Sequence, residues 1–139
     1  MAYDPDNIFA KILRGELPCH KIYEDDATFV FLDIMPRADG HMLVIPKTAC
    51  RNVLDASPDQ LNACIATTQK MAQTAMTAFE ADGITLQQFN EGPGGQEVFH
   101  LHFHVLPRHE GMRLRPPGTM ADQDVLKGHA EKLRAALNG

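Results

Sequence analysis

The sequence has few cysteines, no excess of basic residues and no long apolar segment, and each absence excludes a class of protein. The three cysteines, Cys19, Cys50 and Cys64, are odd in number and form no C-x-x-C pair, which argues against a disulfide framework and a cysteine-ligated zinc site. Thirteen Lys and Arg against eighteen Asp and Glu leave a net charge of −5. Since no basic run is available to follow a phosphodiester backbone, we expect no nucleic-acid partner.

Membrane and secretion signals are absent as well. No apolar run approaches the roughly 18 residues that a membrane helix needs. The acidic start, from Met1 to Asp6, lacks the basic and apolar regions of a secretory signal. We therefore expect a cytoplasmic protein that does not bind membranes. A length of 139 residues with 44% hydrophobic content predicts a single domain over residues 1–139 with a sizeable core.

Residue spacing predicts helices and strands in one α+β domain. A short helix is expected over residues 7–13, capped by Asp6 and ended by Gly15. Ser57, with Pro58 and Gln60 after it, is a typical helix start, and the central helix continues toward Gly83. Its expected buried face is Leu61, Ile65, Thr68, Ala72, Ala75, Met76 and Phe79. Strands are expected at 21–23, 28–32, 41–45, 84–89 and 99–106, and a last helix at 122–137.

The strand expected at 99–106 carries the most informative pattern. His100, His102 and His104 alternate with apolar residues, so they share one face of a strand, and the residues between them face the core. Successive imidazoles on such a face lie about 6.6 Å apart, from a rise of roughly 3.3 Å per residue. One small anion or metal ion can then contact two of them. The apolar residues on the other face are Leu101, Phe103 and Val105.

Other candidate site residues surround this strand. The segment from Glu91 to Gln96 is rich in glycine, and glycines let backbone N–H groups approach an anion such as phosphate closely. Asp33 ends a predicted strand, where its carboxylate can accept from two sugar hydroxyls, and His41 stands at the start of another. Asn90 and Gln96 can orient a leaving group.

Three reactions use histidines in this arrangement. Neutral imidazoles can bind a metal, one imidazole can attack phosphorus and form a phosphohistidine, or the group can simply bind an anion. The glycine segment and Asp33 favour phosphorus chemistry. Because no cluster of carboxylates or cysteines is present to complete a metal shell, we expect neither a metal nor another cofactor.

These residues resemble a known family. The segment from His100 to Leu106 matches the signature H-φ-H-φ-H-φ-φ, with φ apolar, of the histidine-triad (HIT) nucleotide hydrolases and transferases. Further similar segments follow the family's order over roughly residues 7–107. They are Asp33-Ile34-x-Pro36, His41-x-Leu43-Val44-Ile45-Pro46-Lys47, Asn90-Glu91-Gly92 and Gly95-Gln96-x-Val98.

The resemblance implies a fold and a reaction. The fold is α+β, with a five-stranded antiparallel sheet, a short N-terminal helix, a long central helix and a homodimer. His102 is the implied nucleophile on the α-phosphorus of a purine nucleotide, and water then releases a nucleoside monophosphate. The other implied catalytic residues are His41, His100 and His104. The implied nucleotide-binding residues are Asp33, Ile34, Asn90, Gly94, Gly95, Gln96, Glu97 and Val98.

Departures from the family pattern bear on the substrate. Asn7 and Ala10 stand where many bacterial relatives have the C-x-x-C of a structural zinc site, so no zinc is expected. Glu97 replaces the Ser or Thr of eukaryotic relatives and adds negative charge near the phosphate. The segments around Pro46 and Asn90 favour a nucleoside phosphoramidase, and we expect that activity. The alternatives are a dinucleoside polyphosphate hydrolase, suggested by Leu106-Pro107-Arg108, a non-catalytic nucleotide-binding regulator, and a metal-dependent enzyme.

Overall fold

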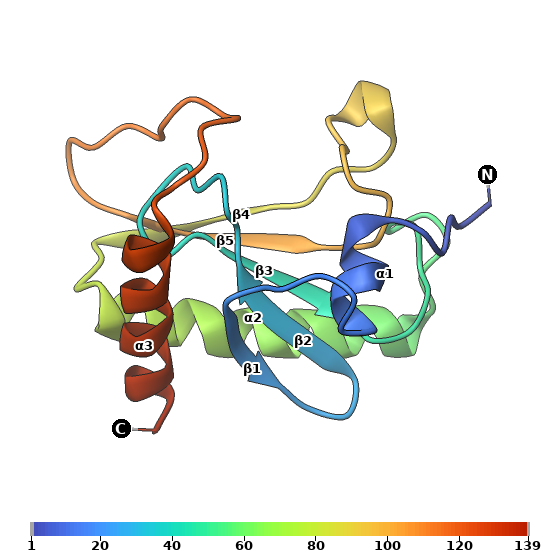
Figure 1. Cartoon of the computed structure of the whole chain (residues 1–139), viewed down its shortest axis with the longest axis horizontal. Helices are drawn as coiled ribbons and strands as arrows, with labels where there is room; N and C mark the ends of the chain where they lie inside the picture. The colour runs from blue at the N-terminus through green and yellow to red at the C-terminus, as the bar shows by residue number, and fades with distance from the viewer. Residues whose placement is uncertain (1, 139) are drawn as a thin grey trace.

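The computed structural model describes residues 2–138 and is built around one antiparallel sheet (Figure 1). Its five strands lie in the order β1-β2-β3-β5-β4, and every neighbouring pair is antiparallel. The α+β class and the five strands expected from the sequence are confirmed. The strands are β1 (Lys21–Glu24), β2 (Thr28–Leu32), β3 (Met42–Pro46), β4 (Gly83–Gln87) and β5 (Phe103–Arg108).

Three helices accompany the sheet. They are α1 (Ile8–Leu13), α2 (Pro58–Ala78) and α3 (Gln123–Asn138), and a single 3₁₀ turn, η1 (Gly92–Gly94), lies between β4 and β5. The long helix α2 runs along the sheet, and α3 contacts α2, β1 and β2 (Figure 1). No helix within residues 2–138 combines the length and the apolar character needed to cross a bilayer.

The helix boundaries differ in detail from those expected. The cap of α1 is Asn7, whose side chain accepts from the backbone N–H of Ala10, and not Asp6. Gly15, at a φ of 77°, follows the helix end as expected. The Ser57 capping box of α2 is confirmed. This helix ends at Ala78, before Gly83, because Glu80 turns to a left-handed φ of 47°.

The buried face of α2 is rotated relative to the expected one. Ile65 and Met76 are 53% and 40% exposed, whereas Thr68 and Ala75 are buried as expected. The difference arises because polar residues occupy the buried stripe. Thr67, for example, bonds through its hydroxyl to that of Thr28 at 2.8 Å. The buried residues are Cys64, Thr67, Thr68, Met71, Thr74 and Ala75.

The strand expected at 99–106 begins later and ends later than its pattern suggests. β5 starts at Phe103, so His100 and His102 lie in a bend before it and only His104 is in the strand. The bend forms because the Leu101 N–H donates to the carbonyl of Cys50 at 2.8 Å instead of to a neighbouring strand. The apolar face is nevertheless confirmed, since Leu101 and Val105 are fully buried and Phe103 packs against the core.

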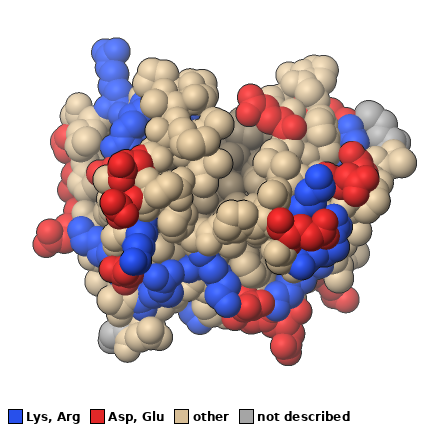
Figure 2. All heavy atoms as spheres, viewed as in Figure 1, with Lys and Arg blue, Asp and Glu red and all other residues tan. Residues whose placement is uncertain are grey.

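The two faces of the sheet have separate apolar clusters. On the face covered by α2 and α3, a cluster includes Val44, Met71 and Val105, and its members from α3 include Leu126 and Leu133. The opposite face carries a smaller cluster with α1, formed by Phe9, Phe31, Leu43 and Ile45. Because paired residues on neighbouring strands point to the same side, the pairing of Leu43 with His104 places His104 on the α1 face. The surface is hollowed between two lobes, with acidic and basic side chains interspersed around it (Figure 2).

Candidate active site

The ring of His102 is held in one tautomer by the backbone. Its Nδ1 lies 2.6 Å from the carbonyl oxygen of His100, an atom that can only accept a hydrogen bond. Nδ1 therefore carries the proton, and Nε2 keeps its lone pair. The Phe9 ring from α1 packs edge-on against His102, with 4.9 Å between ring centroids, and restricts its rotation. One unprotonated nitrogen is thus available as a nucleophile.

The ring of His100 is 1% exposed and is bonded at both nitrogens. Its Nε2 lies 2.9 Å from the carbonyl oxygen of Pro46, the last residue of β3, and therefore carries the proton. Its Nδ1 lies 2.6 Å from the hydroxyl of Tyr3. Since neither nitrogen is free, the side chain of His100 anchors the bend, and the backbone carbonyl of the same residue orients His102.

His41, which directly precedes β3, and His104 in β5 form a hydrogen-bonded pair. The Nδ1 of His41 accepts from the backbone N–H of Arg37 at 3.1 Å, so the proton of His41 is on Nε2. That Nε2 lies 2.8 Å from Nδ1 of His104. His104 consequently carries its own proton on Nε2. The centroids of the His102 and His104 rings are 5.0 Å apart, so the protonated Nε2 of His104 belongs to a ring that neighbours His102 and its unprotonated Nε2.

Burial keeps these four histidines neutral near pH 7. It lowers the pKa of His41 to about 4 and that of His104 to about 3, and the charge of Arg37 adds to both shifts. Burial also lowers the pKa values of His100 and His102, although the carbonyls that accept from their rings oppose the shift. The neutral ring is the form that can attack phosphorus.

Asp33 follows β2 and stands beside the histidine pair. Its Oδ2 is 3.6 Å from Nε2 of His41, but this contact is no ion pair near pH 7 because burial lowers the pKa of His41 to about 4. The other oxygen, Oδ1, accepts from the Met35 N–H at 2.8 Å. Burial raises the pKa of Asp33 against the effect of that hydrogen bond, and the charge of Glu97 adds to the rise. Ile34, 41% exposed, offers an apolar contact on the same wall.

Asp33, His41 and His104 also have the side-chain types of a metal site, with one ligating atom of each within 4.8 Å of the others. The nitrogens of the two imidazoles, however, point at one another across a 2.8 Å hydrogen bond. A metal ion can take both nitrogens only if that bond is lost and the rings turn. Within residues 2–138 no other group of three His, Cys, Asp or Glu comes as close. The arrangement is that of a proton-sharing pair, and the expected absence of a metal stays a prediction.

The glycine-rich loop between β4 and β5 is anchored by an ion pair. Nε and Nη2 of Arg51 donate to the Glu91 carboxylate at 2.7 and 2.8 Å, and Nδ2 of Asn52 donates to it at 2.6 Å. Glu91 has a φ of 64°, a left-handed conformation that is uncommon outside glycine. The three donors therefore stabilise a strained residue at the start of η1.

Gln96, expected from the sequence to contact the ligand, is 4% exposed and uses its side chain inside the loop. Its Oε1 accepts from Asn52 Nδ2 at 3.0 Å and from the Glu91 N–H at 2.8 Å. Its Nε2 donates to the carbonyls of Arg51 and Val98 at 2.8 and 3.0 Å. All four hydrogen bonds of the amide are made within the protein, so Gln96 sets the shape of the loop.

Asn90 also acts inside the loop, because its Oδ1 accepts from the Val53 N–H at 2.9 Å. Gly94 and Gly95 are exposed, and their expected contact with a nucleotide stays a prediction. Gly95 has a φ of 100°, and a Cβ there would lie 3.1 Å from the Phe89 ring, so the position requires glycine. The same Phe89 ring lies 5.6 Å from that of His104, which links the loop to the histidines.

Glu97 and Val98 complete the set of expected site residues. Val98 packs against the apolar cluster under α1. Glu97 is exposed and forms no hydrogen bond or ion pair within residues 2–138. The negative charge of Glu97 raises the pKa of Asp33. The rim of the site therefore carries two carboxylates in electrostatic contact.

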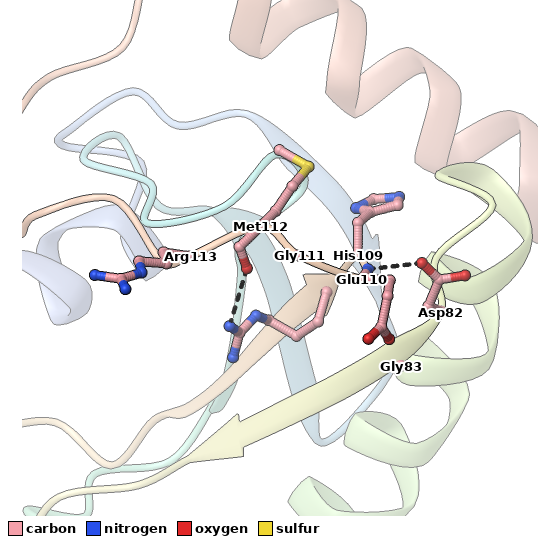
Figure 3. A pocket seen from close by; sticks show the side chains of 8 residues that line it. Asp82, Gly83, His109, Glu110, Gly111, Met112 and Arg113 are labelled. Atoms are coloured by element: carbon pink, nitrogen blue, oxygen red, sulfur yellow. Dashed lines mark hydrogen bonds between the residues drawn. The ribbon is translucent and has the colours of Figure 1, made fainter.

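A separate hollow lies at the far end of β5 (Figure 3). It has a volume of about 470 Å³ and is lined by Asp82, Gly83 and residues 108–113. None of the expected site residues lines it. Its Arg108 is already bonded to Thr85 Oγ1 at 3.0 Å and to the Met112 carbonyl at 3.4 Å, so it is not a free anion ligand.

Three residues of the site have no signal in the sequence that identifies them. Tyr3, Arg51 and Asn52 reach the histidines or the glycine loop from segments far away along the chain. No local spacing connects Tyr3 with His100. For Arg51 and Asn52, the buried polar residues of the loop require donors, but only the fold shows which residues supply them.

The chain is similar to known proteins in sequence and in structure. The model of the HIT domain family matches residues 14–111. The adenosine 5'-monophosphoramidase HNT1 of Candida albicans is 32% identical over 144 residues, which cover 99% of this chain and 95% of that protein. The adenylylsulfatase HINT3 of Arabidopsis thaliana is 36% identical over 105 residues, which cover 76% of this chain and 53% of that protein.

A solved structure shows the same fold over almost the whole chain. It is a HIT-like protein from Bartonella henselae, described as involved in cell-cycle regulation and crystallised with an unknown ligand. The two chains are 50% identical and superpose with a TM-score of 0.94, covering 98% of this chain and 99% of the other.

Proposed function

The chain belongs to the HIT domain family, and on that basis we propose that it hydrolyses purine nucleoside 5'-phosphoramidates, or related nucleotidyl conjugates, to nucleoside monophosphates. The observation that carries the proposal is the hydrogen bond from Nδ1 of His102 to the His100 carbonyl. This bond leaves Nε2 as a free, neutral nucleophile. Two relatives that are named as hydrolases of adenylyl compounds support the substrate class.

The first step forms a bond between Nε2 of His102 and the α-phosphorus. The bond from phosphorus to the leaving nitrogen breaks, and the departing amine takes up a proton from solvent, which the attacking water of the second step returns. In the second step, water cleaves the nucleotidyl-histidine and regenerates His102. His104, whose proton is directed away from His41, is our candidate donor to the phosphoryl oxygens. One preorganised donor of this kind typically contributes about 10²–10³-fold in rate.

The proposed nucleotide lies between the two walls of the site. Asp33 takes the ribose hydroxyls through its free oxygen, and Ile34 contacts the base. The exposed backbone of Gly94 and Gly95 faces the phosphate. The side chains of Asn90 and Gln96 hold the loop through hydrogen bonds to Val53 and Arg51, and Val98 packs against the apolar cluster under α1.

The charge of the site favours a phosphoramidate over a polyphosphate. The four histidines are neutral near pH 7, and the rim carries the carboxylates of Asp33 and Glu97, while Arg37 adds one positive charge and Arg51 at the glycine loop is paired with Glu91. A dinucleoside polyphosphate brings several negative charges to this rim. A phosphoramidate brings one negative charge, and its leaving group is an amine, whose positive charge Glu97 attracts.

The test is turnover of a fluorogenic adenosine phosphoramidate beside that of a diadenosine polyphosphate. We expect the wild-type protein to favour the first, and His102→Ala to lose turnover while still binding AMP. His20→Gln, which changes a histidine bonded only to Gln123, is the control and keeps full activity. Binding of AMP without turnover of either compound by the wild type would instead identify a nucleotide-binding regulator.

We further propose that the protein acts without a metal and as a homodimer. Full turnover in the presence of a chelator is expected, and loss of activity that returns with added zinc would contradict it. Light scattering of the purified protein measures the mass directly, and a mass of one chain would contradict the dimer.

A further inference from the structure

The N-terminal segment reaches the back of the histidine triad. The Tyr3 hydroxyl lies 2.6 Å from Nδ1 of His100, and the two rings meet edge-on with their centroids 5.6 Å apart. Neither the family match, which begins at residue 14, nor the triad signature includes Tyr3.

The direction of this hydrogen bond follows from the other side of the imidazole. A carbonyl oxygen only accepts, so the contact of Nε2 with Pro46 places the His100 proton on Nε2. A neutral imidazole has one proton, which leaves Nδ1 as an acceptor. The Tyr3 hydroxyl is therefore the donor, and it holds His100 in the Nε2–H tautomer.

Several contacts hold the N-terminal segment in this place. Nη1 of Arg51 donates to the Ala2 carbonyl at 3.3 Å, and Nδ2 of Asn7 donates to the Asp4 carbonyl at 2.8 Å. Since Arg51 also pairs with Glu91, the same guanidinium ties the segment to the glycine loop. The segment that carries Tyr3 is thus tied to the histidines through Tyr3 and to the glycine loop through Arg51.

We propose that Tyr3 is a positioning residue of the active site, whose hydroxyl fixes the ring of His100 and, through the His100 backbone carbonyl, the orientation of the nucleophile His102. The inference rests on the proposed function. The link runs from the Tyr3 hydroxyl to Nδ1 of His100, and from the His100 carbonyl to Nδ1 of His102. Loss of the hydroxyl leaves a buried acceptor without a partner, and the bend before β5 loses one of its anchors.

The same hydrogen bond has a pH signature. The groups that face the His100 ring are Tyr3 from the N-terminal segment, the Pro46 carbonyl from β3 and His102 from the same bend. A donor to Nδ1 stabilises the neutral ring, because the protonated ring has no lone pair there to accept it. Removal of the hydroxyl therefore raises the pKa of His100, and protonation disturbs the site at a higher pH.

The experiment compares Tyr3→Phe with Tyr23→Phe, which removes the hydroxyl of the only other tyrosine, bonded to Asp25 on the far side of the sheet from α1. The ring nitrogens of His100 are followed by NMR of the protein labelled with ¹⁵N-histidine. We expect an Nε2–H tautomer in the wild type. In Tyr3→Phe, the His100 Nδ1 resonance should shift to the position of a ring nitrogen that accepts no hydrogen bond. His100 should also titrate at a higher pH.

Turnover supplies the second readout. We expect kcat of Tyr3→Phe to fall by about 2–10-fold, the factor that corresponds to one net hydrogen bond. KM should change by less than about 2-fold, and the acid limb of the pH profile should move upward, since the pKa of a catalytic-site group is raised. Tyr23→Phe should match the wild type in kcat, KM and pH profile. Tyr3→Ala removes the ring as well, and its further loss separates packing from the hydroxyl.

An unchanged His100 resonance and an unchanged pH profile in Tyr3→Phe would overturn the inference, as would equal effects in Tyr23→Phe. The NMR measurement needs no substrate. If the wild type turns over no nucleotide, the proposed function fails, while the tautomer and titration of His100 still decide the role of Tyr3.

Discussion

Replacing Gln96 with glutamate tests whether this side chain shapes the glycine loop. The substitution keeps the size of the side chain but exchanges the amide NH₂ for a carboxylate oxygen. The two acceptor contacts, from Asn52 and from the Glu91 N–H, can persist. The two donated bonds, to the carbonyls of Arg51 and Val98 at 2.8 and 3.0 Å, cannot. Two carbonyl oxygens then face a negative charge in a place that is 4% exposed.

The magnitude follows from the two lost donors. Each buried group left without its partner costs about 1–3 kcal/mol, so we expect Gln96→Glu to lower the free energy of unfolding by about 2–6 kcal/mol at pH 7. The total free energy of unfolding of a domain of this size is about 5–15 kcal/mol. The variant is therefore close to unfolding or, where it folds, has a disordered glycine loop and weak binding of AMP.

The loss depends on pH with a definite sign. Burial beside carbonyl oxygens raises the pKa of the introduced carboxyl above its unfolded value of about 4.3. The protonated form can donate one of the missing bonds. The destabilisation is therefore smaller near pH 5 than at pH 7, and it grows as the pH rises through the pKa of the folded state.

Urea unfolding at pH 5 and pH 7 measures both effects. Gln73→Glu, on the exposed side of α2, is the matched control and should change the free energy of unfolding by less than about 0.5 kcal/mol. A Gln96→Glu protein within about 1 kcal/mol of the wild type at pH 7 would refute the reasoning, because a cost that small leaves no room for two broken buried hydrogen bonds.

Three further outcomes follow from the same structure. Gly40→Ala should lower the free energy of unfolding, measured by urea unfolding, by about 2–4 kcal/mol, because Gly40 has a φ of 81° and a Cβ there would lie 2.4 Å from the Phe79 ring. The control Gly15→Ala, at a φ of 77° with open space around it, should lower it by only about 1 kcal/mol. Turnover should persist well below pH 6.5, since burial lowers the pKa values of the site histidines. The free energy of unfolding should decrease as the pH drops below about 6.5, because the unfolded chain then binds protons that the folded site does not. An activity midpoint at about pH 6.5, the ordinary pKa of histidine, would contradict this. Glu97→Gln should raise kcat/KM for a diadenosine polyphosphate relative to that for a phosphoramidate by about 2–5-fold, the factor expected for one exposed charge. An unchanged ratio, with both substrates measured side by side, would exclude Glu97 as a determinant of leaving-group preference.

Local pattern was sufficient for much of the fold. The capping box at Ser57, the glycine stop at Gly15 and the alternation in β2 and β3 predicted elements that the structure contains. The pattern failed where a residue type contradicts its environment. Thr67 is polar and was therefore not expected to be buried, yet its hydroxyl bonds to Thr28 inside the core. Apolar Ile65, conversely, stays on the surface.

The site shows a different kind of limit. Alternation at 99–106 correctly separated the histidines from the core residues, but it also predicted a continuous strand. The bend that replaces it depends on a hydrogen bond from Leu101 to Cys50, a contact between distant segments. Gln96 and Asn90 were expected to face the ligand because they are polar and next to glycines, and their contact with a nucleotide stays a prediction. No spacing rule reveals that Gln96 also donates to the Arg51 carbonyl and that Asn90 accepts from the Val53 N–H.

The three histidines of the motif differ chiefly in what occupies Nδ1. In His102 it donates to a carbonyl, which leaves Nε2 unprotonated and makes it the proposed nucleophile. In His104 it accepts from His41, so Nε2 bears a proton. In His100 it accepts from Tyr3, while Nε2 is used by Pro46, and neither nitrogen remains for a substrate. The proposed nucleophilic, proton-donating and anchoring roles of identical side chains thus follow from their different partners. Two of these partners, Tyr3 and His41, lie outside the motif, and exchanging either should change the role of its histidine without touching the triad itself.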